Sequence, residues 1–386
     1  MQIIEVTTKE QAQQFLQLPL QLYKNDKNWA QPLDKDIDEV FDKEKNKFFR
    51  HGICARWLLA DNGKTIGRVA AFVNHKLAKK NDQPTGGMGF FECINDQKAA
   101  NILFDTCAEW LKEQGMEAMD GPINFGERES WWGLIIDGFN PPQYKMNYNL
   151  PYYQTLFETY GFKDYFQQHC YAIEQLEDLP QKFYQRHAEI SKIPEYSFRT
   201  LKMNEIEKYA EDFRSIYNQA WVQHGSGRDL EQKQVQGFFK KLKPIIDPDI
   251  MAFAYYKNDP VAFAICLPDI NQLFRKLNGK FGLWQKIKFF VMLKMHVCTK
   301  MIGTVFGIIP AHQGKGLDAY IFVEMEKIVK RKKSYDEFEM QWVGDFNPRM
   351  LNIAKEFCPV RSRVLVTYRF LFDRTKEFVR HPVIRG

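Results

Sequence analysis

Residues 303–319 read GTVFGIIPAHQGKGLDA, and this stretch decides the predicted fold. Its first part is an apolar run that favours a β-strand up to Pro310, and its last part passes through Gly314 and Gly316 into a helical pattern. Glycine lets a backbone come close to a ligand, and the free N–H groups at the start of a helix attract a pyrophosphate. The stretch therefore predicts a phosphate-binding turn, to which Lys315 can add positive charge.

The elements on either side of this turn follow a mixed α/β order. Upstream, two apolar runs at 251–256 and 261–267 flank a turn, which is typical of a β-hairpin. Downstream, the patterns of a helix, a strand, a second helix and a last strand follow at 317–331, 337–343, 348–357 and 363–372. Antiparallel hairpins before a single strand–helix–strand crossover predict a mixed sheet and not a doubly wound parallel one.

The first half of the chain repeats this order in a weaker form. A hairpin is predicted around Asn62 and Gly63, because Asn-Gly between two apolar runs is a strong turn signal. A strand pattern at 87–94 and a helical pattern at 97–114 follow. The chain therefore looks like two copies of one α/β unit.

Length and composition agree with two globular domains. The 386 residues exceed what a single core usually takes, and 45% hydrophobic with 26% charged residues is typical of a globular protein. The predicted units are 1–175, a linker with a helix at 176–196, and 197–386. The N-terminus lacks a leader pattern and no window approaches about 20 apolar residues, so we expect a cytoplasmic protein. The charge of +6 is spread along the chain, so we expect no nucleic-acid partner.

The turn resembles the signature of the Gcn5-related N-acetyltransferase (GNAT) superfamily, which reads Gln/Arg-x-x-Gly-x-Gly/Ala after a strand and a proline. Gln313 and Gly316 match this signature, and Pro310 stands where the family often has a proline. Asp318 departs from the last Gly/Ala position. An acid there can repel a phosphate unless it turns outward or caps the helix.

The resemblance covers roughly residues 251–372 and implies two tandem GNAT-like domains, with an acyl-CoA in the second. In the family, strands four and five splay apart and the pantetheine arm pairs with strand four. An Asn before the following helix contacts that arm. The cofactor-binding residues implied in this chain are Phe306, Gly307, Ile308, Ile309, Gln313, Gly314, Lys315, Gly316, Leu317, Asp318, Ala319 and Asn347.

The first half lacks such a turn, although it too resembles the GNAT fold. Its corresponding stretch, residues 94–100, contains no glycine and cannot offer the same close backbone approach. We therefore expect no phosphate cradle in the first half.

The chemistry that the resemblance implies is attack of an amine on a thioester, which needs a route for a proton and donors for the oxyanion. In many family members a Glu on strand four or five receives the proton. Strand alternation makes Glu339 the first carboxylate to test, with Asp345 next. A solvent-facing or capping role is the favoured alternative for each. The family's general-acid Tyr is absent from 352–358, which leaves Tyr368 as a substitute.

We therefore predict an acyl-CoA-dependent N-acyltransferase that carries an acyl group, in the simplest case from acetyl-CoA, to an amine of a small molecule or peptide. No metal is expected, because the Cys and His residues lack zinc-site spacing. The alternative is a protein of the same fold that binds CoA or a partner without catalysis. The acceptor and the oligomeric state stay open, since acceptor pockets are built from variable loops.

Two further segments stand out. Residues 121–133 hold Trp131 and Trp132 beside charged residues, and predict either an acceptor-side wall with Glu127, Arg128 and Glu129 or, as the favoured interpretation, a loop that plugs the domain interface. Residues 281–296 mix apolar and basic side chains. They predict a helix at a membrane surface, although a helix that covers the sheet or the acceptor channel with snorkelling lysines is favoured.

Overall fold

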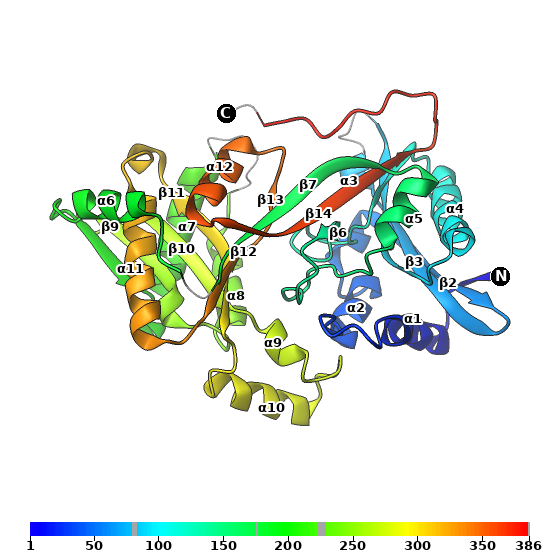
Figure 1. The fold of residues 1–386 in the computed structure, drawn as a ribbon, viewed down its shortest axis with the longest axis horizontal. Coiled ribbons are helices and arrows are strands. Elements are labelled where there is room, and N and C mark those ends of the chain that lie inside the picture. The colour runs from blue at the N-terminus through cyan, green and yellow to red at the C-terminus, as the bar shows by residue number, and fades with distance from the viewer. Residues whose placement is uncertain (79–82, 175–176, 223–228, 385–386) are drawn as a thin grey trace.

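The computed structural model describes residues 1–78, 83–174, 177–222 and 229–384. The fourteen strands of this part of the chain form one sheet that runs through both halves of the molecule (Figure 1). Most neighbouring strands are antiparallel, and each half contains one parallel pair joined by a crossover helix. This is the mixed α/β sheet that the sequence predicted.

The first half begins with an edge strand and two helices, then forms the hairpin predicted at Asn62 and Gly63 and a crossover helix. Its elements are β1 (Gln2–Glu5), α1 (Lys9–Leu22), α2 (Asp34–Phe41), the 3-10 helix η1 (Lys47–Arg50), β2 (Gly52–Asp61), β3 (Lys64–Asn74), α3 (His75–Ala78), β4 (Thr85–Cys93), α4 (Gln97–Glu113), β5 (Ala118–Gly121), β6 (Leu134–Asp137), α5 (Tyr153–Tyr160) and β7 (Lys163–Ile173).

The second half repeats this order after the helix α6, which lies in the predicted linker. Its elements are α6 (Gln181–Ile190), β8 (Tyr196–Thr200), α7 (Ile206–Val222), α8 (Gln232–Leu242), β9 (Met251–Tyr256), β10 (Asp259–Pro268), α9 (Asn271–Phe274), α10 (Leu283–Lys294), β11 (Lys300–Ile308), α11 (Leu317–Lys332), β12 (Glu337–Met340), β13 (Val343–Gly344), α12 (Pro348–Phe357) and β14 (Val360–Leu371). Residues 175 and 176, at the predicted domain boundary, lie outside the described residues, so that boundary stays a prediction.

The two halves exchange their last long strands. The order across the sheet is β1-β2-β3-β4-β5-β14-β7-β12-β11-β10-β9-β8. β14, the last strand of the chain, pairs with β5 of the first half, and β7, which ends the first half, pairs with β12 of the second. β7 and β14 lie side by side at the centre of the molecule (Figure 1). Each half therefore completes its sheet with a strand from the other.

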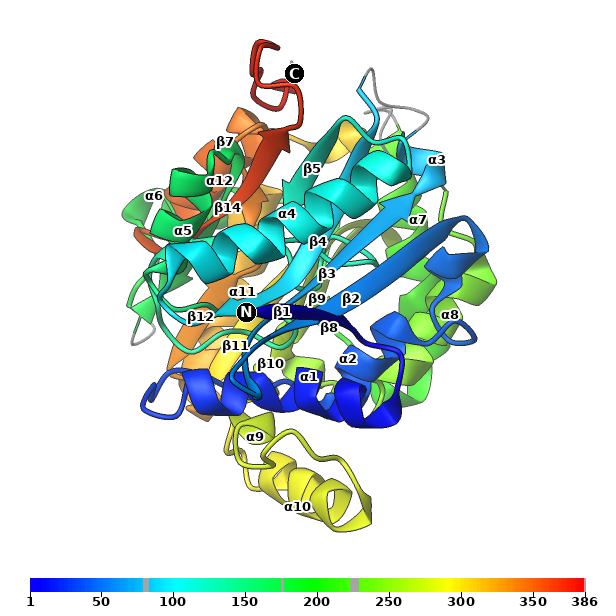
Figure 2. The same cartoon turned by 90° about the vertical axis from the view of Figure 1, so that its right-hand side faces the viewer.

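Helices cover both faces of the sheet in each half. In the first half, α4 and α5 pack on one face, where α4 crosses the strands (Figure 2), and α1 and α2 pack on the other. In the second half, α6, α11 and α12 share one core with the sheet, and α7 and α8 share another. Apolar side chains that alternate along the strands feed these separate cores.

The strand predicted at 337–343 is interrupted. β12 ends at Met340, and β13 begins at Val343 and pairs with β7. Between them, the N–H of Gln341 donates to the carbonyl of Gly303 at 2.9 Å. The alternation that the sequence indicated holds for Phe338 and Glu339, which pair in register with β7, and it breaks after Met340.

A buried ion pair joins the exchanged strands. Glu339 on β12 and Arg363 on β14 both have fully buried side chains, and the guanidinium meets the carboxylate through Nε at 2.8 Å and Nη2 at 3.2 Å. Lys300 on β11 adds a second cation, with its Nζ 3.2 Å from Oε2 of Glu339. Arg363 also donates to the carbonyls of Asn140 and Pro141. One carboxylate thus links three strands of the second half, and Arg363 connects them to the first half.

Burial by itself would raise the pKa of Glu339. The charges of Arg363 and Lys300, with hydrogen bonds from Arg363 and Ser362, outweigh it and lower the pKa to about 2. The unfolded chain has the ordinary glutamate pKa of about 4.3. The ionised Glu339 therefore stabilises the fold at pH values above about 4.3, and this contribution is lost as the pH falls toward about 2.

We expect Arg363→Met to lower the free energy of unfolding at pH 7 by about 3–5 kcal/mol, because it leaves the buried carboxylate of Glu339 with one cation in place of two. Urea unfolding measures this loss. Adding Glu339→Leu removes the buried charge and should recover part of the stability. A double variant no more stable than the single one would contradict the assignment.

We also expect a pH dependence. In the wild type the free energy of unfolding should fall between about pH 5 and pH 2 as Glu339 is protonated, and Glu339→Gln should show a smaller fall over this range when urea unfolding is measured at each pH.

Candidate functional site

The glycine turn between β11 and α11 has the backbone geometry that a phosphate cradle needs. Gly314 and Gly316 adopt left-handed conformations, with φ of +73° and +85°. Gly316 is the N-cap of α11, and no side chain caps the first N–H groups of this helix. Those groups are therefore open to an anion, with the positive end of the helix dipole behind them.

Side chains brace this turn from both sides. Gln313 donates through Nε2 to the carbonyl of Ile308 at 3.0 Å, and its Oε1 accepts from Arg349 of α12 at 3.2 Å. A Cβ at Gly316 would lie 3.4 Å from the Cβ of Arg186 on α6. Arg186, Arg349 and the exposed Lys315 therefore place positive charge around the turn.

β11 parts from β12 just before the turn. The two strands pair only over Lys300–Gly303 and Glu337–Met340. On its other side, β11 pairs with β10 through a bulge, since Gly303 and Val305 face consecutive residues and leave Thr304 unmatched. The stretch from Thr304 to Ile308, which contains most of the predicted pantetheine-binding residues, is therefore unpaired toward β12. Phe306 lies there, with its ring 5.0 Å from that of Phe322 on α11.

The remaining predicted cofactor residues surround this turn in different ways. Leu317 and Ala319 are fully buried, so only their backbone groups can meet a ligand. Asp318 lies in the first turn of α11, where an acid is favourable for the helix and competes with a phosphate. Asn347 caps α12, with its Oδ1 accepting from the N–H of Met350 at 3.2 Å. Asn347 and the turn are linked through α12, whose Arg349 reaches Gln313.

The three predicted catalytic side chains do not come together. Glu339 is sealed in the central ion pair, and Asp345 pairs with Arg380 at 2.7 Å. Tyr368 lies in the first half, because β14 pairs with β5, and its hydroxyl donates to Glu158 at 2.8 Å. The role of Tyr368 as a substitute general acid stays a prediction.

The electrostatics of these groups give no support to the predicted proton transfer. A general base works best with a pKa near the working pH. The ion pair holds the pKa of Glu339 at about 2 against the effect of burial. Burial, and then the hydrogen bond to Glu158, raise the pKa of Tyr368. The catalytic roles of Glu339, Asp345 and Tyr368 stay predictions without a geometric basis.

In the first half, a side chain blocks the position that corresponds to the glycine turn. At the start of α4, Oδ1 of Asp96 accepts from the N–H groups of Lys98 and Ala99 at 2.7 and 3.2 Å. A carboxylate thus occupies the place that a phosphate would take. Beside β4, a Cβ at Gly89 would lie 1.8 Å from the carbonyl oxygen of Ile123, so the chain after β5 fills the gap next to β4.

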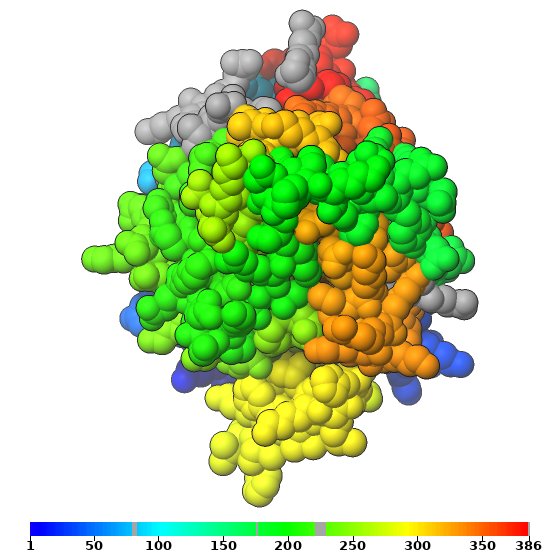
Figure 3. Space-filling view, turned by 90° about the vertical axis from the view of Figure 1, so that its left-hand side faces the viewer, coloured from blue at the N-terminus to red at the C-terminus, as the bar shows by residue number. Residues whose placement is uncertain are grey.

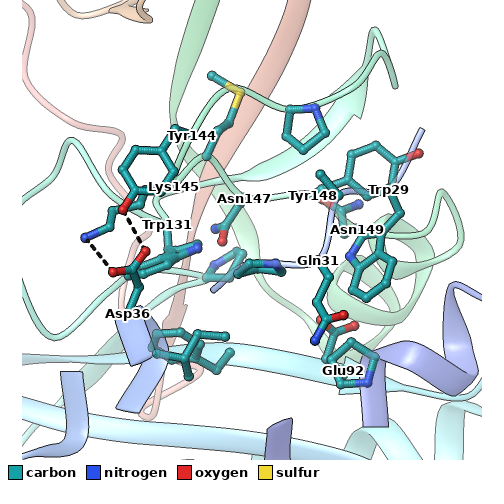
Figure 4. A pocket seen from close by; sticks show the side chains of 18 of the residues that line it. Trp29, Gln31, Asp36, Glu92, Trp131, Tyr144, Lys145, Asn147, Tyr148 and Asn149 are labelled. Carbon is teal, nitrogen blue, oxygen red and sulfur yellow. Dashed lines mark hydrogen bonds and ion pairs between the residues drawn. The ribbon is translucent and has the colours of Figure 1, made fainter. Parts of the chain in front are cut away.

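The first half instead contains a pocket that the sequence did not indicate (Figure 4). It encloses about 990 Å³, including space open to solvent, and Trp29, Trp131 and Tyr148 form aromatic walls. Figure 4 also shows Asp36 at its side, bonded to the hydroxyl of Tyr144 at 2.6 Å and paired with Lys145 at 3.8 Å. Residues 313–319 are not among those that line it.

A buried polar cluster forms the floor of this first-half pocket. Glu92 on β4 accepts from the hydroxyls of Tyr23 at 2.8 Å and Tyr153 at 2.7 Å, and lies 3.4 Å from Arg68. Burial raises the pKa of Glu92, although Arg68 and both tyrosines oppose it. Nε of Arg68 and Nε2 of Gln143 are buried without a partner. These two donors suit a ligand that carries acceptor oxygens.

Sequence reasoning missed this cluster, although a signal was present. Arg68 and Glu92 are charged residues inside the apolar strand runs of β3 and β4, where alternation alone places them in a core. The 121–133 segment belongs here as well. Trp131 is buried in the first half's own core, with its ring 5.7 Å from Phe90, and it lines the pocket together with Asn271 and Phe274 of the second half. The interpretation of this segment as a plug of the domain interface stays a prediction.

Two known proteins are similar to this chain over most of its length. No family model matches the chain. The bacterial ceramide synthase of Caulobacter vibrioides is 24% identical over 364 residues, which covers 92% of this chain and 93% of the synthase. Protein YghO of Escherichia coli is 23% identical over 363 residues, with 90% and 89% covered.

Solved structures give the same architecture. A tandem GNAT protein from the clavulanic acid biosynthesis pathway has a TM-score of 0.53 at 10% identity, covering 97% of this chain and 99% of its own. A GCN5-related glucosamine N-acetyltransferase region of a fungal β-N-acetylglucosaminidase has a TM-score of 0.54 at 13% identity, covering 96% and 38%. The chain therefore has the tandem GNAT fold, with two units of this fold in one polypeptide.

Proposed function

We propose that this chain is an acyl-CoA-dependent N-acyltransferase that holds its cofactor in the second half. The observation that carries the proposal is the glycine turn at 313–319. Two left-handed glycines and an uncapped helix start lie directly beyond a strand that has left its neighbour. In the proposal, the N–H groups of α11 bind the pyrophosphate, while the unpaired backbone of Thr304–Ile308 receives the amide groups of the pantetheine arm.

For the chemistry, we propose that a neutral amine attacks the thioester carbon and that N–H groups at the Thr304 bulge steady the developing oxyanion. Collapse of the tetrahedral intermediate breaks the carbon–sulfur bond, and the proton lost by the amine nitrogen passes to the thiolate, so CoA departs as the thiol. Glu339 takes no part in this scheme, because its carboxylate serves the central ion pair. Its role in the proposal is to link β12 to β14 across β7.

The acyl group and acceptor that we propose are long-chain ones. The Caulobacter relative is named a ceramide synthase, and a ceramide is the amide of a fatty acid with a long-chain amino alcohol. A chamber on the α11 side of the sheet supports this. It encloses about 470 Å³, open space included, and nine of its twelve lining residues are apolar, with Met301, Phe322 and Met325 among them, while Glu177, Glu326 and Lys330 also line it. Phe322 joins it to Phe306 in the unpaired part of β11.

We expect Gly316→Glu to weaken CoA binding by at least ~10-fold, because it adds a side chain at a left-handed position and a negative charge beside the pyrophosphate. Isothermal titration with CoA measures the effect. Gly237→Glu, on α8 with open space around its Cβ, is the matched control and should bind normally. Lys315→Glu reverses an exposed charge without touching the glycines and should also bind less tightly. Unchanged binding by both variants of the turn would refute the cofactor site.

We expect Met325→Phe to reduce turnover of palmitoyl-CoA by about 10-fold and to leave acetyl-CoA turnover within about 2-fold, because it fills the apolar chamber. Release of free CoA thiol in the presence of a long-chain amino alcohol measures both rates. A thermal unfolding curve checks that the larger side chain is tolerated. Equal losses with both thioesters would show that the chamber does not hold the acyl chain.

A second candidate function is CoA binding without catalysis. It is favoured by one observation, the commitment of Glu339 and Asp345 to ion pairs with Arg363 and Arg380. The thiol-release assay separates the two candidates. A wild-type chain that binds CoA in the titration, and releases no thiol with amines of short and long chain, would establish the second candidate.

A further inference from the structure

The insertion between β10 and β11, residues 269–299, stands out from the body of the molecule. It contains α9 and α10 and projects below the rest of the chain (Figures 1 and 3). α10 is held by one face, where Phe289 and Met292 are buried with Leu33 and Phe274. The small core to which it belongs takes no residue from the sheet, so α10 does not cover the sheet as the sequence favoured.

The outer face of α10 is apolar and exposed. Six large apolar side chains at and just beyond this helix are between 42% and 78% exposed, namely Leu283, Trp284, Ile287, Phe290, Val291 and Met295. We call them the apolar stripe. Single exposed apolar residues are ordinary, but a contiguous group of this kind marks a surface that binds something.

The spacing puts the stripe on one side of the helix. At about 100° per residue, its six side chains fall within an arc of about 140°, and Phe289 lies opposite the middle of that arc. Lys286 and Lys288 lie just outside the two borders, and both are exposed. Lys294 falls within the arc at the last turn, where its long stem can carry the ammonium group to the edge of the stripe.

The charged residues within the sequence of the insertion, from 270 to 299, all have one sign. Residues 270–299 contain six lysines and arginines and no aspartate or glutamate. A helix with a wide apolar face, lysines along its borders and an exposed Trp fits the boundary between head groups and acyl chains of a bilayer. Within the described residues no helix is long and apolar enough to cross a membrane. α10, with 12 residues, suits a position parallel to the surface.

We propose that the apolar stripe of α10 docks this protein on an anionic phospholipid membrane. The stripe enters the interface, and Lys286, Lys288 and Lys294 contact lipid phosphates. A second copy of the chain is a poorer occupant. Two stripes packed together would bring the bordering lysines of both copies into contact, with no acid among residues 270–299 to pair with them.

Docking would also bring the first-half pocket to the membrane. Asn271 and Phe274 at the base of the insertion line that pocket beside first-half residues, and Asn271 donates to the carbonyl of Pro142 at 2.6 Å. Phe274 stacks on Phe289 of α10 with ring centroids 5.1 Å apart. The helix that carries the stripe is therefore packed directly against a wall of the pocket.

Vesicle flotation of the full chain tests the proposal. The wild-type protein should float with vesicles of phosphatidylcholine mixed with phosphatidylglycerol, and much less with pure phosphatidylcholine. The triple change Leu283→Ser, Trp284→Ser and Ile287→Ser should lower the bound fraction by ~10-fold or more. Lys286→Glu with Lys288→Glu should abolish the preference for the anionic vesicles, and salt should weaken wild-type binding. A wild-type chain that stays unbound with both vesicles overturns the proposal.

Two controls make the result specific to α10. Phe238→Ser removes an exposed aromatic ring from α8 and should leave flotation unchanged. Trp284→Phe keeps the stripe apolar, and it should retain flotation but lose most of the fluorescence blue shift and the quenching by brominated lipid. If the triple variant floats as the wild type does, the stripe is not the docking surface. If the wild type dimerises without binding vesicles and the triple variant is monomeric, the stripe is a contact between copies and the proposal fails.

Discussion

The buried pair of Glu339 and Arg363 is the contact on which the shared sheet depends. It links β12 to β14 across β7, and Arg363 also donates to the carbonyls of Asn140 and Pro141 in the first half. A buried carboxylate that has lost its cation is strongly destabilising, so the pair holds β14 and β12 together. The glycine turn benefits indirectly, because β12 pairs with β7 on one side and leaves β11 after Gly303 on the other.

This exchange also explains where the sequence succeeded and where it misled. The hairpin at Asn62 and the turn at Gly316 depend on residues close together in the chain, and their local patterns predicted them well. Strand alternation was used to select Glu339, which lies on β12. Alternation contains no information on which distant strand becomes the neighbour, so the sequence could not show that Glu339 pairs with Arg363 or that Tyr368 lies opposite β5.

The first-half pocket escaped the sequence for the same reason. Glu92 and Arg68 are recognisable as charges within apolar strands, but their partners, Tyr23 and Tyr153, come from helices far away in the chain. Only the folded chain shows that these groups share one cavity. The absence of a phosphate turn next to β4 was predictable, since it rests on local residues, and Asp96 at the start of α4 agrees with it. The two halves thus share one fold, but the first contains a polar pocket and the second contains the glycine turn.

In the amphipathic insertion, composition determines the pattern of α10, and packing determines which face of that helix is buried. Its apolar and basic pattern is the same whether a helix covers a sheet or faces a membrane, and the choice depends on which side chains find a core. Phe289 and Met292 use only a narrow face, and the rest stays exposed because no sheet surface lies within reach. Long-chain amines and acyl thioesters are scarce as monomers in water and concentrate at bilayers. A chain that transfers between such molecules gains access to them by residing at that surface, which gives the apolar stripe a physical reason to stay uncovered.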